Sequence, residues 1–281
     1  PFGHAGERIL SSLYQEHTGR YFNHNVHSVR VLDDMVNWNI SLQTLDGILC
    51  HNGELELKEY RPCEMSTFVE YDKKVEACYV DENAIGELIP CTLEGCVMRI
   101  CDIIAYLGKD RQDAMRLNLL KESPFTAGAI GTSNGEIINN FSVNIIENSY
   151  GKDYLKMDEE YFDALRQAKK ENYEMIYNNK SLNDLYENEI RPMFGELYEE
   201  LLRQAESGDK SSVFYRHHMA YMEKNNFYVK SHVRKPYAEQ EKNQLVVDYL
   251  ASMTDDYFIA LYHYLFPKGK HDVKFVGYFD L

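Results

Sequence analysis

The sequence predicts a mainly α-helical protein in which residues 1–281 form one large domain, with a hairpin or short strands as minor elements. Apolar residues recur at helical spacing through most of the chain, and no repeat, low-complexity tract or long linker interrupts it. Hydrophobic residues make up 44% and charged residues 27%, which is typical of a globular protein with a sizeable core. No apolar run approaches the roughly 18–20 residues that a membrane span needs.

The N-terminal third of the chain predicts three helices before a less regular stretch. Ile9, Leu10, Leu13 and Tyr14 mark the first helix, and Ser41 is placed to cap the third. We expect these helices over residues 6–15, 25–38 and 41–49. Residues 52–91 contain Pro62 and Pro90 and predict a surface excursion.

Helical spacing returns after residue 91, with one further irregular stretch at 121–156. Within it the alternating residues 137–146 predict a short hairpin or a connection between helices, and the tail 273–281 is the one late segment typical of a strand. Pro192 is expected to kink or divide the helix that contains it. We expect a helix over residues 92–109 that continues or restarts over 110–120, and later helices over residues 157–177, 182–204, 212–224 and 238–266.

Charge and cysteine usage exclude several classes of function. The formal net charge of −15 argues against strong nucleic-acid binding, which needs a surplus of Lys and Arg, although it leaves a small anionic substrate open. The six cysteines include no Cys-x-x-Cys pair. Cys91, Cys96 and Cys101 are spaced by five residues, so on a helix they lie on different faces and do not converge on one metal ion. We therefore expect reduced thiols in a cytoplasmic protein and no structural zinc site. The first residues show no leader for export.

Two groups of residues are candidates for chemistry. His4 and Glu7 are three apart, so at a helix start they share one face and can meet one substrate. Asp102, Tyr106 and Asp110 follow at i, i+4 and i+8 on one stripe among apolar neighbours, and a buried carboxylate there needs a cation. The alternatives are a satisfied or exposed histidine, an exposed Asp110, an Asp102 that caps a neighbouring helix, and a Tyr106 in the core.

Two strings near the N-terminus carry a family resemblance. They are Pro1-Phe2-Gly3-His4-Ala5-Gly6-Glu7 and Phe22-Asn23-His24-Asn25-Val26-His27-Ser28. Together they resemble the HD-domain deoxynucleoside triphosphate triphosphohydrolases, the dGTPase family. Its members read His-Asp-hydrophobic-Gly-x-Pro-Pro-Phe-Gly-His-x-Gly-Glu and then Phe-x-His-Asn-x-Gln-Ser. His27 replaces the family's Gln, and Pro1 falls on the second Pro, so we expect two metal ligands to lie upstream of this sequence.

The resemblance continues through three later segments in the same order. Thr92-Leu93-Glu94-Gly95 followed by Arg99, Asp102, Ala105 and Tyr106 is similar to the family's helix with an Asp-Asp-hydrophobic-Ala-Tyr string, with Ile103 at the second Asp. Met175-Ile176-Tyr177-Asn178-Asn179 resembles Val-Tyr-Asn-His, with Asn179 replacing His. Val246-Val247-Asp248-Tyr249-Leu250-Ala251-Ser252-Met253-Thr254-Asp255 is similar to Val-x-Asp-Tyr-Ile-Ala-Gly-Met-Thr-Asp.

This resemblance implies roles for single residues in an HD-domain helical bundle. Asp102 would be the last metal ligand, and Tyr106 and Asp110 would contact a deoxyribose. His4 and Glu7 would orient or deprotonate the attacking water, and His24 would stabilise or protonate the leaving oxygen. Further contacts are expected from Tyr186 at the 2′ position and from Tyr249, for which core packing is an equal alternative, and from Lys109 and Lys152 as phosphate cations or solvated charges.

The implied activity is metal-dependent hydrolysis of a deoxynucleoside triphosphate, dGTP first, by attack at the α-phosphorus. Its products are the deoxynucleoside and tripolyphosphate. The metal would be Mg²⁺ or Mn²⁺, or another transition metal, and the family implies a homo-oligomer, a tetramer or hexamer. Two alternatives remain: another HD nucleotide phosphohydrolase, and a non-catalytic HD-like regulatory or interaction subunit.

Overall fold

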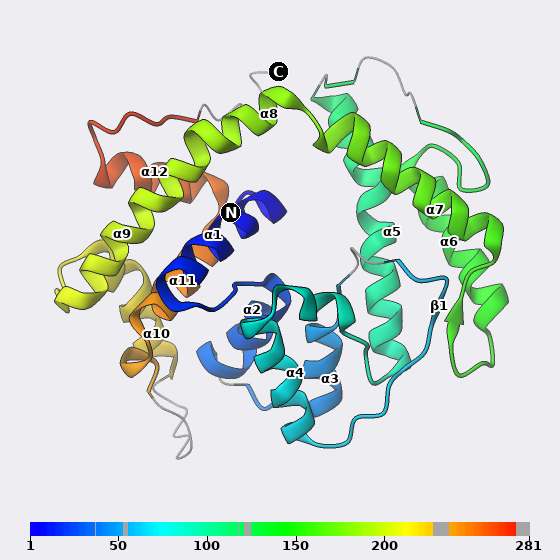
Figure 1. Cartoon of the computed structure of the whole chain (residues 1–281), viewed down its shortest axis with the longest axis horizontal. Helices are drawn as coiled ribbons and strands as arrows, with labels where there is room; N and C mark the ends of the chain where they lie inside the picture. The colour runs from blue at the N-terminus through cyan, green and yellow to red at the C-terminus, as the bar shows by residue number, and fades with distance from the viewer. Residues whose placement is uncertain (37, 53–55, 118, 121–124, 227–235, 274–281) are drawn as a thin grey trace. The chain divides into compact units, whose positions relative to one another are not determined.

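The computed structural model describes residues 1–36, 38–52, 56–117, 119–120, 125–226 and 236–273. Twelve α-helices and a single two-stranded sheet account for the regular elements of these residues, so the predicted mainly α class is confirmed (Figure 1). None of the described helices combines the length and hydropathy that a bilayer crossing requires.

The chain divides into two compact units, each assembled from several segments. Unit 1 comprises Pro1–Ile40, Val75–Glu82 and Asp184–Asp280, and unit 2 comprises Ser41–Lys74 and Asn83–Asn183. Three elements contribute to both units: α4 (Phe68–Val80), the 3₁₀ turn Glu82–Glu87 and α8 (Lys180–Leu185). The sequence predicts one domain, and that stays a prediction.

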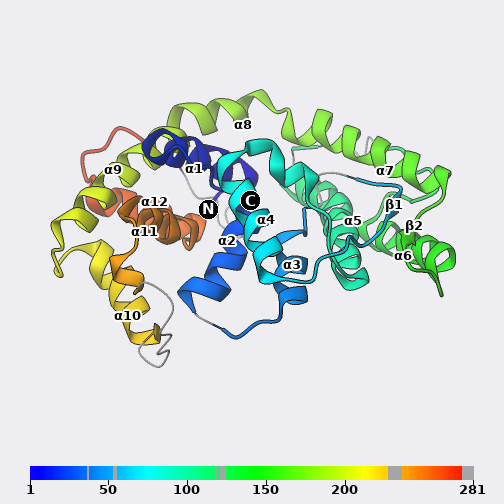
Figure 2. The same ribbon diagram turned by 60° about the horizontal axis from the view of Figure 1, so that its bottom comes forward.

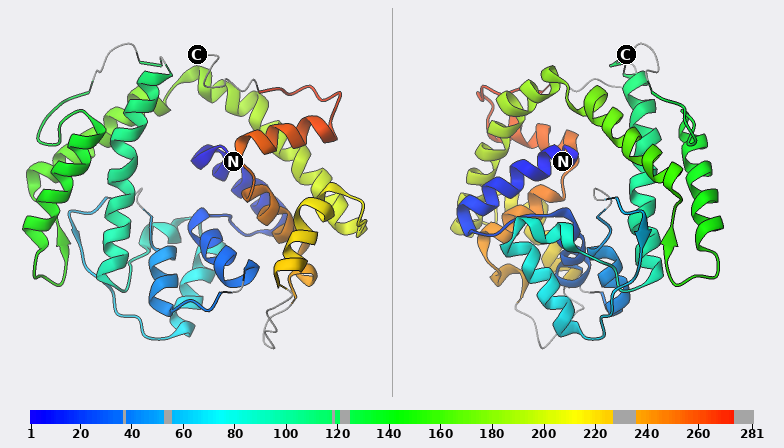
Figure 3. Two further views of the ribbon diagram at one scale, coloured as in Figure 1. Left: turned by 180° about the vertical axis from the view of Figure 1, so that it is seen from behind. Right: turned by 45° about the vertical axis from the view of Figure 1, so that its right-hand side comes forward.

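Unit 1 is a group of helices in which α1, α9 and α11 pack against one another. Both views of Figure 3 show α1 running beside α11. Phe194 and Leu197 of α9 and Leu245 and Leu250 of α11 are fully buried in the shared core. Burial of each such side chain stabilises the fold by roughly 1.5–3 kcal/mol. The helices of unit 1 are α1 (Gly3–Thr18), α2 (His24–Arg30), α9 (Arg191–Ser207), α10 (Ala220–Asn226), α11 (Lys242–Ala251) and α12 (Asp255–Leu265).

Unit 2 is built around the long helix α5 (Leu93–Arg116), which packs against α3 (Leu42–Leu49), α6 (Asn134–Ser149) and α7 (Glu159–Asn172). Figure 2 shows α5, α6 and the strands gathered in one part of the unit. The strands β1 (Glu59–Tyr60) and β2 (Leu155–Lys156) pair antiparallel, with Glu59 opposite Lys156. The two halves predicted over 92–120 are therefore one helix that ends at Arg116.

Several predicted starts and breaks agree with the structure. Ser41 caps α3 by accepting the backbone N–H of Thr44, and Thr92 caps α5 in the same way from Gly95. Pro192 lies in the first turn of α9, directly after a π-helical turn over Tyr186–Ile190, and the backbone stays right-handed helical through this junction, so the hydrogen-bond pattern changes there without a break. The predicted helix 238–266 is divided, because Thr254 caps a new helix, α12.

Two of the predicted irregular stretches contain helices instead. Residues 137–146 lie inside α6, so the predicted hairpin or connection is wrong. A capping box joins Ser133 and Glu136 at its start, and Ile137 and Phe141 face the core one turn apart. The stretch 52–91 includes α4, with Tyr71 and Cys78 buried. The predicted late strand falls almost wholly on residues 274–281, outside the described residues.

Candidate active site in unit 1

The first turn of α1 has a backbone conformation that glycine makes possible. Gly3 has a φ of +52° and Phe2 a φ of 60°, both in the left-handed region. Gly6 allows the closest approach, because a Cβ at this position would lie 2.0 Å from the carbonyl oxygen of Pro1. The Gly6 N–H donates to the Phe2 carbonyl at 3.1 Å. The glycines of the opening string therefore fold residues 1–3 back over the start of α1.

The side chain of Phe2 anchors this turn in the core of unit 1. Its ring makes edge contacts with Phe258, Phe194 and Tyr186, at centroid distances of 5.3, 6.1 and 6.4 Å. Phe194 and Phe258 are fully buried. Aromatic edge contacts of this kind add roughly 0.5–1.5 kcal/mol each to the area they bury. With Phe2 held, the positions of His4 and Glu7 on α1 are set by a rigid element.

Glu7 connects α1 to the first residue of α2. The Asn23 side chain caps α2 by accepting the N–H of Asn25 at 2.9 Å. His24, the next residue, donates its backbone N–H to Glu7 Oε1 at 2.7 Å. The His24 ring Nδ1 lies 2.9 Å from Oε1 and 3.0 Å from Oε2 of the same carboxylate. Glu7 thus fixes both the backbone and the ring of His24.

The electrostatics of this pair favour an ionised Glu7. Burial alone would raise the pKa of Glu7, but the hydrogen bonds and positive charge of His24, with a smaller contribution from His4, hold it below its usual range. A carboxylate on Nδ1 makes that nitrogen the donor, so Nε2 is the ring atom of His24 that can exchange a proton with a bound molecule. The ring of His4 lies 5.5 Å from that of His24.

His4, Glu7 and His24 also offer donors for a metal ion. One ligand atom from each lies within 4.8 Å of the other two, and no other group of three or more such residues does so among the described residues. Imidazole nitrogen with carboxylate oxygen suits a borderline divalent cation. The same three residues can therefore serve a cation or perform proton transfer.

These residues face a cavity of about 400 Å³ in unit 1. Pockets for small molecules have volumes of roughly 300–1,000 Å³, so this cavity is large enough for part of a nucleotide. Its walls combine the imidazole and carboxylate groups with apolar side chains. They include His4, Glu7, His24, His27, Leu10, Phe22 and Phe194.

A buried ion pair lies behind the wall of this cavity at His27. Arg30 donates from Nε and Nη2 to the two carboxylate oxygens of Asp248, at 2.7 and 2.6 Å. The Tyr237 hydroxyl donates to the same carboxylate at 2.9 Å and contacts His218 Nε2 at 2.7 Å. His27 Nδ1 lies 3.7 Å from Asp248. Burial lowers the pKa of both histidines, that of His218 to about 4, and so keeps them neutral.

The residues predicted on α5 lie in unit 2. Asp102 and Tyr106 are half-buried, and Tyr106 packs at the edge of the unit 2 core. Lys109 is exposed and forms an ion pair with Asp113 at 2.6 Å. The Tyr177 hydroxyl donates to Asp110. Among the described residues Asp102 belongs to no group of three metal-ligating side chains, so its role as a ligand stays a prediction.

Tyr186 and Tyr249 of unit 1 have different surroundings. Tyr186 is partly buried beside Phe2, and burial raises the pKa of its hydroxyl. Tyr249 is 3% exposed, stacks on His218, and shares a hydroxyl contact of 2.6 Å with Tyr257. This placement supports core packing for Tyr249, which the sequence left as an equal alternative to substrate contact.

Comparison with known proteins gives the ancestry of the chain. A family model described as a phosphohydrolase-associated domain matches residues 155–264. Proteins named deoxyguanosinetriphosphate triphosphohydrolase-like match 95% of the chain at 26% identity in Caldanaerobacter subterraneus subsp. tengcongensis, 24% in Desulfatibacillum aliphaticivorans and 25% in Clostridium tetani. The chain is a relative of these triphosphohydrolase-like proteins. It spans 63%, 66% and 65% of their respective lengths, and no solved structure matches it.

The phosphohydrolase-associated segment covers only part of the predicted site of this triphosphohydrolase relative. It begins at β2 and includes α7, α9, α10, α11 and most of α12, and so contains Tyr186, Asp248 and Tyr249. His4, Glu7, His24 and Asp102 lie before it. The relatives from Caldanaerobacter subterraneus subsp. tengcongensis and Desulfatibacillum aliphaticivorans match a larger share of the chain, 95% of its residues.

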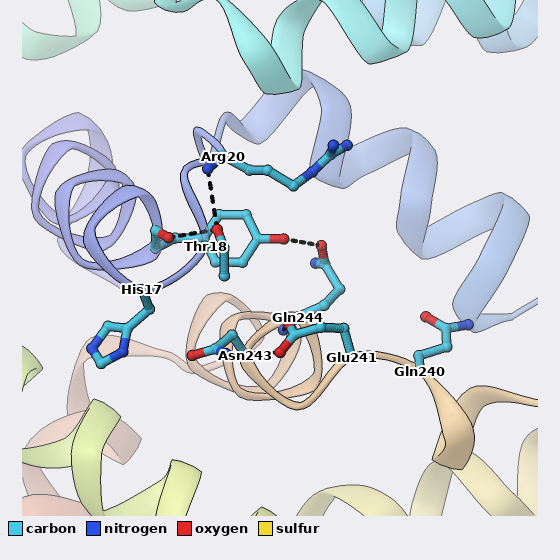
Figure 4. A pocket seen from close by; sticks show the side chains of 8 residues that line it. His17, Thr18, Arg20, Gln240, Glu241, Asn243 and Gln244 are labelled. Carbon is cyan, nitrogen blue, oxygen red and sulfur yellow. Dashed lines mark hydrogen bonds between the residues drawn. The ribbon is translucent and has the colours of Figure 1, made fainter.

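A second cavity of unit 1, of about 490 Å³, lies between the C-terminal end of α1 and the start of α11 (Figure 4). Polar residues from both elements contribute to its lining, and the Tyr14 hydroxyl donates to the amide oxygen of Gln244 at 2.8 Å across one wall. No residue that the sequence singled out for chemistry lines it. The side chains drawn in Figure 4 include His17, Thr18, Arg20, Gln240, Glu241, Asn243 and Gln244.

The network that supports the wall at His27 is not predicted by the sequence. Arg30 and His218 are not part of any motif, and Asp248 entered only as a letter of a family string. One local signal was present, because Asp248 interrupts the apolar run from Leu245 to Leu250 on α11, where all these side chains are buried. A carboxylate in such a run requires a buried cationic partner.

Proposed function

We propose that this triphosphohydrolase relative hydrolyses deoxynucleoside triphosphates, dGTP first, in the cavity of unit 1. Water attacks the α-phosphorus, the bond to the nucleoside 5′-oxygen breaks, and that oxygen takes up a proton. The products are a deoxynucleoside and tripolyphosphate. The names of the relatives support this class of reaction, and the identity of 24–26% leaves the substrate to experiment.

The observation that carries the proposal is the Glu7–His24 pair at the cavity wall, with His4 beside it. A Glu7 whose pKa is held low is a weak base, which supports a role in orienting water and the His24 ring. Nε2 of His24 would then supply the proton for the leaving 5′-oxygen. His4, whose ring lies 5.5 Å from that of His24, would accept the proton of the attacking water.

A divalent metal ion, Mg²⁺ or Mn²⁺, belongs to the proposal and would polarise the phosphate that is attacked. The half-buried carboxylate of Asp102 is an oxygen donor of the kind such ions prefer. Contacts of Tyr106 and Asp110 with the deoxyribose, of Lys109 with phosphate and of Tyr186 with the 2′ position are proposed with it. So is assembly into a homo-oligomer, a tetramer or hexamer.

A product-resolved assay of each dNTP and of GTP, with Mg²⁺ or Mn²⁺, tests this function. We expect tripolyphosphate and free deoxynucleoside, with dGTP turned over and GTP rejected. Asp102→Asn should abolish turnover and reduce bound metal, whereas Asp113→Asn on the same helix should change neither. Pyrophosphate or monophosphate as products would overturn the triphosphohydrolase proposal. Absence of turnover with every nucleotide, in a protein that also contains the expected upstream metal ligands, would favour the non-catalytic HD-like subunit.

A further inference from the structure

Lys74 lies at the centre of a second cluster of reactive side chains, in unit 2. Its Nζ donates to Asp46 Oδ1 at 2.6 Å and to the carbonyl of Ile89 at 2.8 Å. The same nitrogen lies 3.7 Å from the sulfur of Cys50 and 3.8 Å from the sulfur of Cys63. One lysine therefore joins α3, α4 and the segment before α5. Figures 1 and 2 both show α3 and α4 side by side.

The cluster is arranged for an ammonium group and not for a metal ion. No three of its carboxylate and thiol ligand atoms lie within 4.8 Å of one another, as the described residues show. Asp46 is fully buried and accepts Lys74 on one oxygen and the Cys91 backbone N–H, at 2.6 Å, on the other. Burial alone would lower the pKa of Lys74, but Asp46 and the nearby thiols raise it above its usual range.

The three thiols of the cluster differ in access and chemistry. Cys50 is fully buried, and burial followed by the charge of Asp46 raises the pKa of its thiol. Burial, followed by a hydrogen bond with Asp46 and the charge of that carboxylate, raises the pKa of Cys91 to about 11. Cys63 is only half-buried, and its thiol donates to the Ile89 carbonyl at 3.1 Å beside the Lys74 ammonium. Partial exposure next to a cation is the environment typical of reactive cysteines.

We propose that Cys63 and Lys74 form an oxidative modification site, in which a peroxide joins the sulfur and the nitrogen through one oxygen atom. In the first step Cys63–SH and one peroxide give the sulfenic acid Cys63–SOH and water. In the second step another peroxide oxidises the sulfenic acid and the Lys74 amine together. The O–H and one N–H bond break, an O–N bond forms, and two waters leave. The ammonium releases one proton, and the product is Cys63–S–O–NH–Lys74.

The position of Lys74 favours this bond. Its Nζ already lies 3.8 Å from the Cys63 sulfur, and all three thiols of the cluster are free of disulfides. The product would also carry no charge on Lys74. Asp46 would then keep its buried carboxylate without a cation, which is strongly destabilising. Oxidation of Cys63 would therefore loosen the connection of α3 and α4 to the segment 88–91.

Peptide mapping by mass spectrometry after treatment of the full chain with hydrogen peroxide tests the proposal. We expect fragments in which Cys63 and Lys74 are joined, with one oxygen gained and two hydrogens lost, and in which dithiothreitol reverses the change. Cys63→Ser and Lys74→Arg should abolish this product. Cys101→Ser, which removes an exposed thiol elsewhere in unit 2, should retain it.

The remaining outcomes overturn the inference. A disulfide from Cys63 to Cys50 or Cys91, seen as a loss of two hydrogens without oxygen, would show that the lysine is not the partner. Equal oxidation of Cys63 and Cys101 by peroxide, without any fragment in which Cys63 and Lys74 are joined, would show the same. Lys74→Arg keeps the cation beside Asp46, and a thermal unfolding curve shows whether that variant folds. If it does not, Cys63→Ser alone decides, since it leaves the Asp46–Lys74 ion pair intact.

Discussion

Glu7 Oε1 accepts the backbone N–H of His24 at 2.7 Å and faces its ring Nδ1 at 2.9 Å, so one carboxylate fixes both the position and the tautomer of one histidine. The hydrogen bonds and positive charge of His24 hold the pKa of Glu7 below its usual range, which favours the ionised carboxylate. This pair is the part of the candidate site for which single substitutions make the sharpest predictions.

Glu7→Gln should lower kcat of the proposed reaction by about 10²–10³-fold with a much smaller change in KM, since positioned acid–base groups contribute roughly 10²–10⁴. The amide keeps the size of Glu7 but removes the charge that orients His24. The matched control is Glu199→Gln, because Glu199 makes a similar contact of 3.0 Å with His17 away from the cavity. Steady-state kinetics of both variants test this prediction. Equal losses of kcat in the two variants would contradict a specific role of Glu7.

Gly6→Ala should displace residues 1–3, because the new Cβ would lie 2.0 Å from the Pro1 carbonyl oxygen. Misplacement of catalytic groups by about 1 Å can cost roughly 10²-fold in rate, and we expect a loss of that order. Gly195→Ala on α9 is the control, because its Cβ would meet nothing within 4 Å. That variant should be unchanged in rate and slightly more stable. Full activity in Gly6→Ala would contradict the packed first turn.

Asp248→Asn should destabilise unit 1 by about 3 kcal/mol, since it removes the buried carboxylate that binds Nε and Nη2 of Arg30, while Asp34, 3.2 Å from Nη1, remains as an anionic neighbour. The double variant Arg30→Met with Asp248→Leu should be more stable than either single change, because it removes both charges. Urea unfolding measures all three. If the double variant equals the sum of the single effects, the two residues are not coupled. Arg203→Met, which breaks an exposed pair with Glu200, should leave the unfolding midpoint unchanged.

The helices and the site residues differ in how far the sequence could predict them. The helices that begin after Ser41 and Thr92 can be predicted locally, because the capping residue and the first apolar residues of each helix lie within one turn of each other. The prediction for residues 137–146 is wrong because their alternation of apolar and polar residues is typical of a strand. The capping box at Ser133 and the packing of Phe141 select a helix instead. The contact of His4, Glu7 and His24 was implied by family strings close together in the chain.

The Arg30–Asp248 pair could not be found in this way, because its members are 218 positions apart and meet only through the packing of α2 and α11. The two histidines that surround the pair show the same limit. Their neutral state depends on burial, which spacing along the chain does not report. The sequence does show a single carboxylate within an apolar helical segment. Because burial of an unpaired carboxylate is costly, this pattern indicates that Asp248 has a buried partner.

His218→Gln should reduce the loss of stability of unit 1 between pH 7 and pH 5. The pKa of His218 falls from 6.5 to about 4 on folding, so its contribution is fully present above pH 6.5 and is lost as the pH falls toward 4. Over the part of this window down to pH 5 the loss is about 2 kcal/mol, at 1.36 kcal/mol for each pH unit. Glutamine keeps an N–H for the Tyr237 hydroxyl and carries no titrating group.

The other charged groups around His218 either keep their charge between pH 7 and pH 5 or add a loss of stability of the same sign. Asp248 and Glu7 have lowered pKa values, so their contributions are lost only below pH 3.8 and 4.5. Arg30 stays charged throughout, and the lowered pKa of His27 adds a loss of the same sign as the pH falls below 6.5. The measurement is urea unfolding of the wild type, His218→Gln and His27→Gln at pH 7 and pH 5. Each variant should lose less stability than the wild type, and a wild-type slope in His218→Gln would mean that His218 is protonated in the folded state.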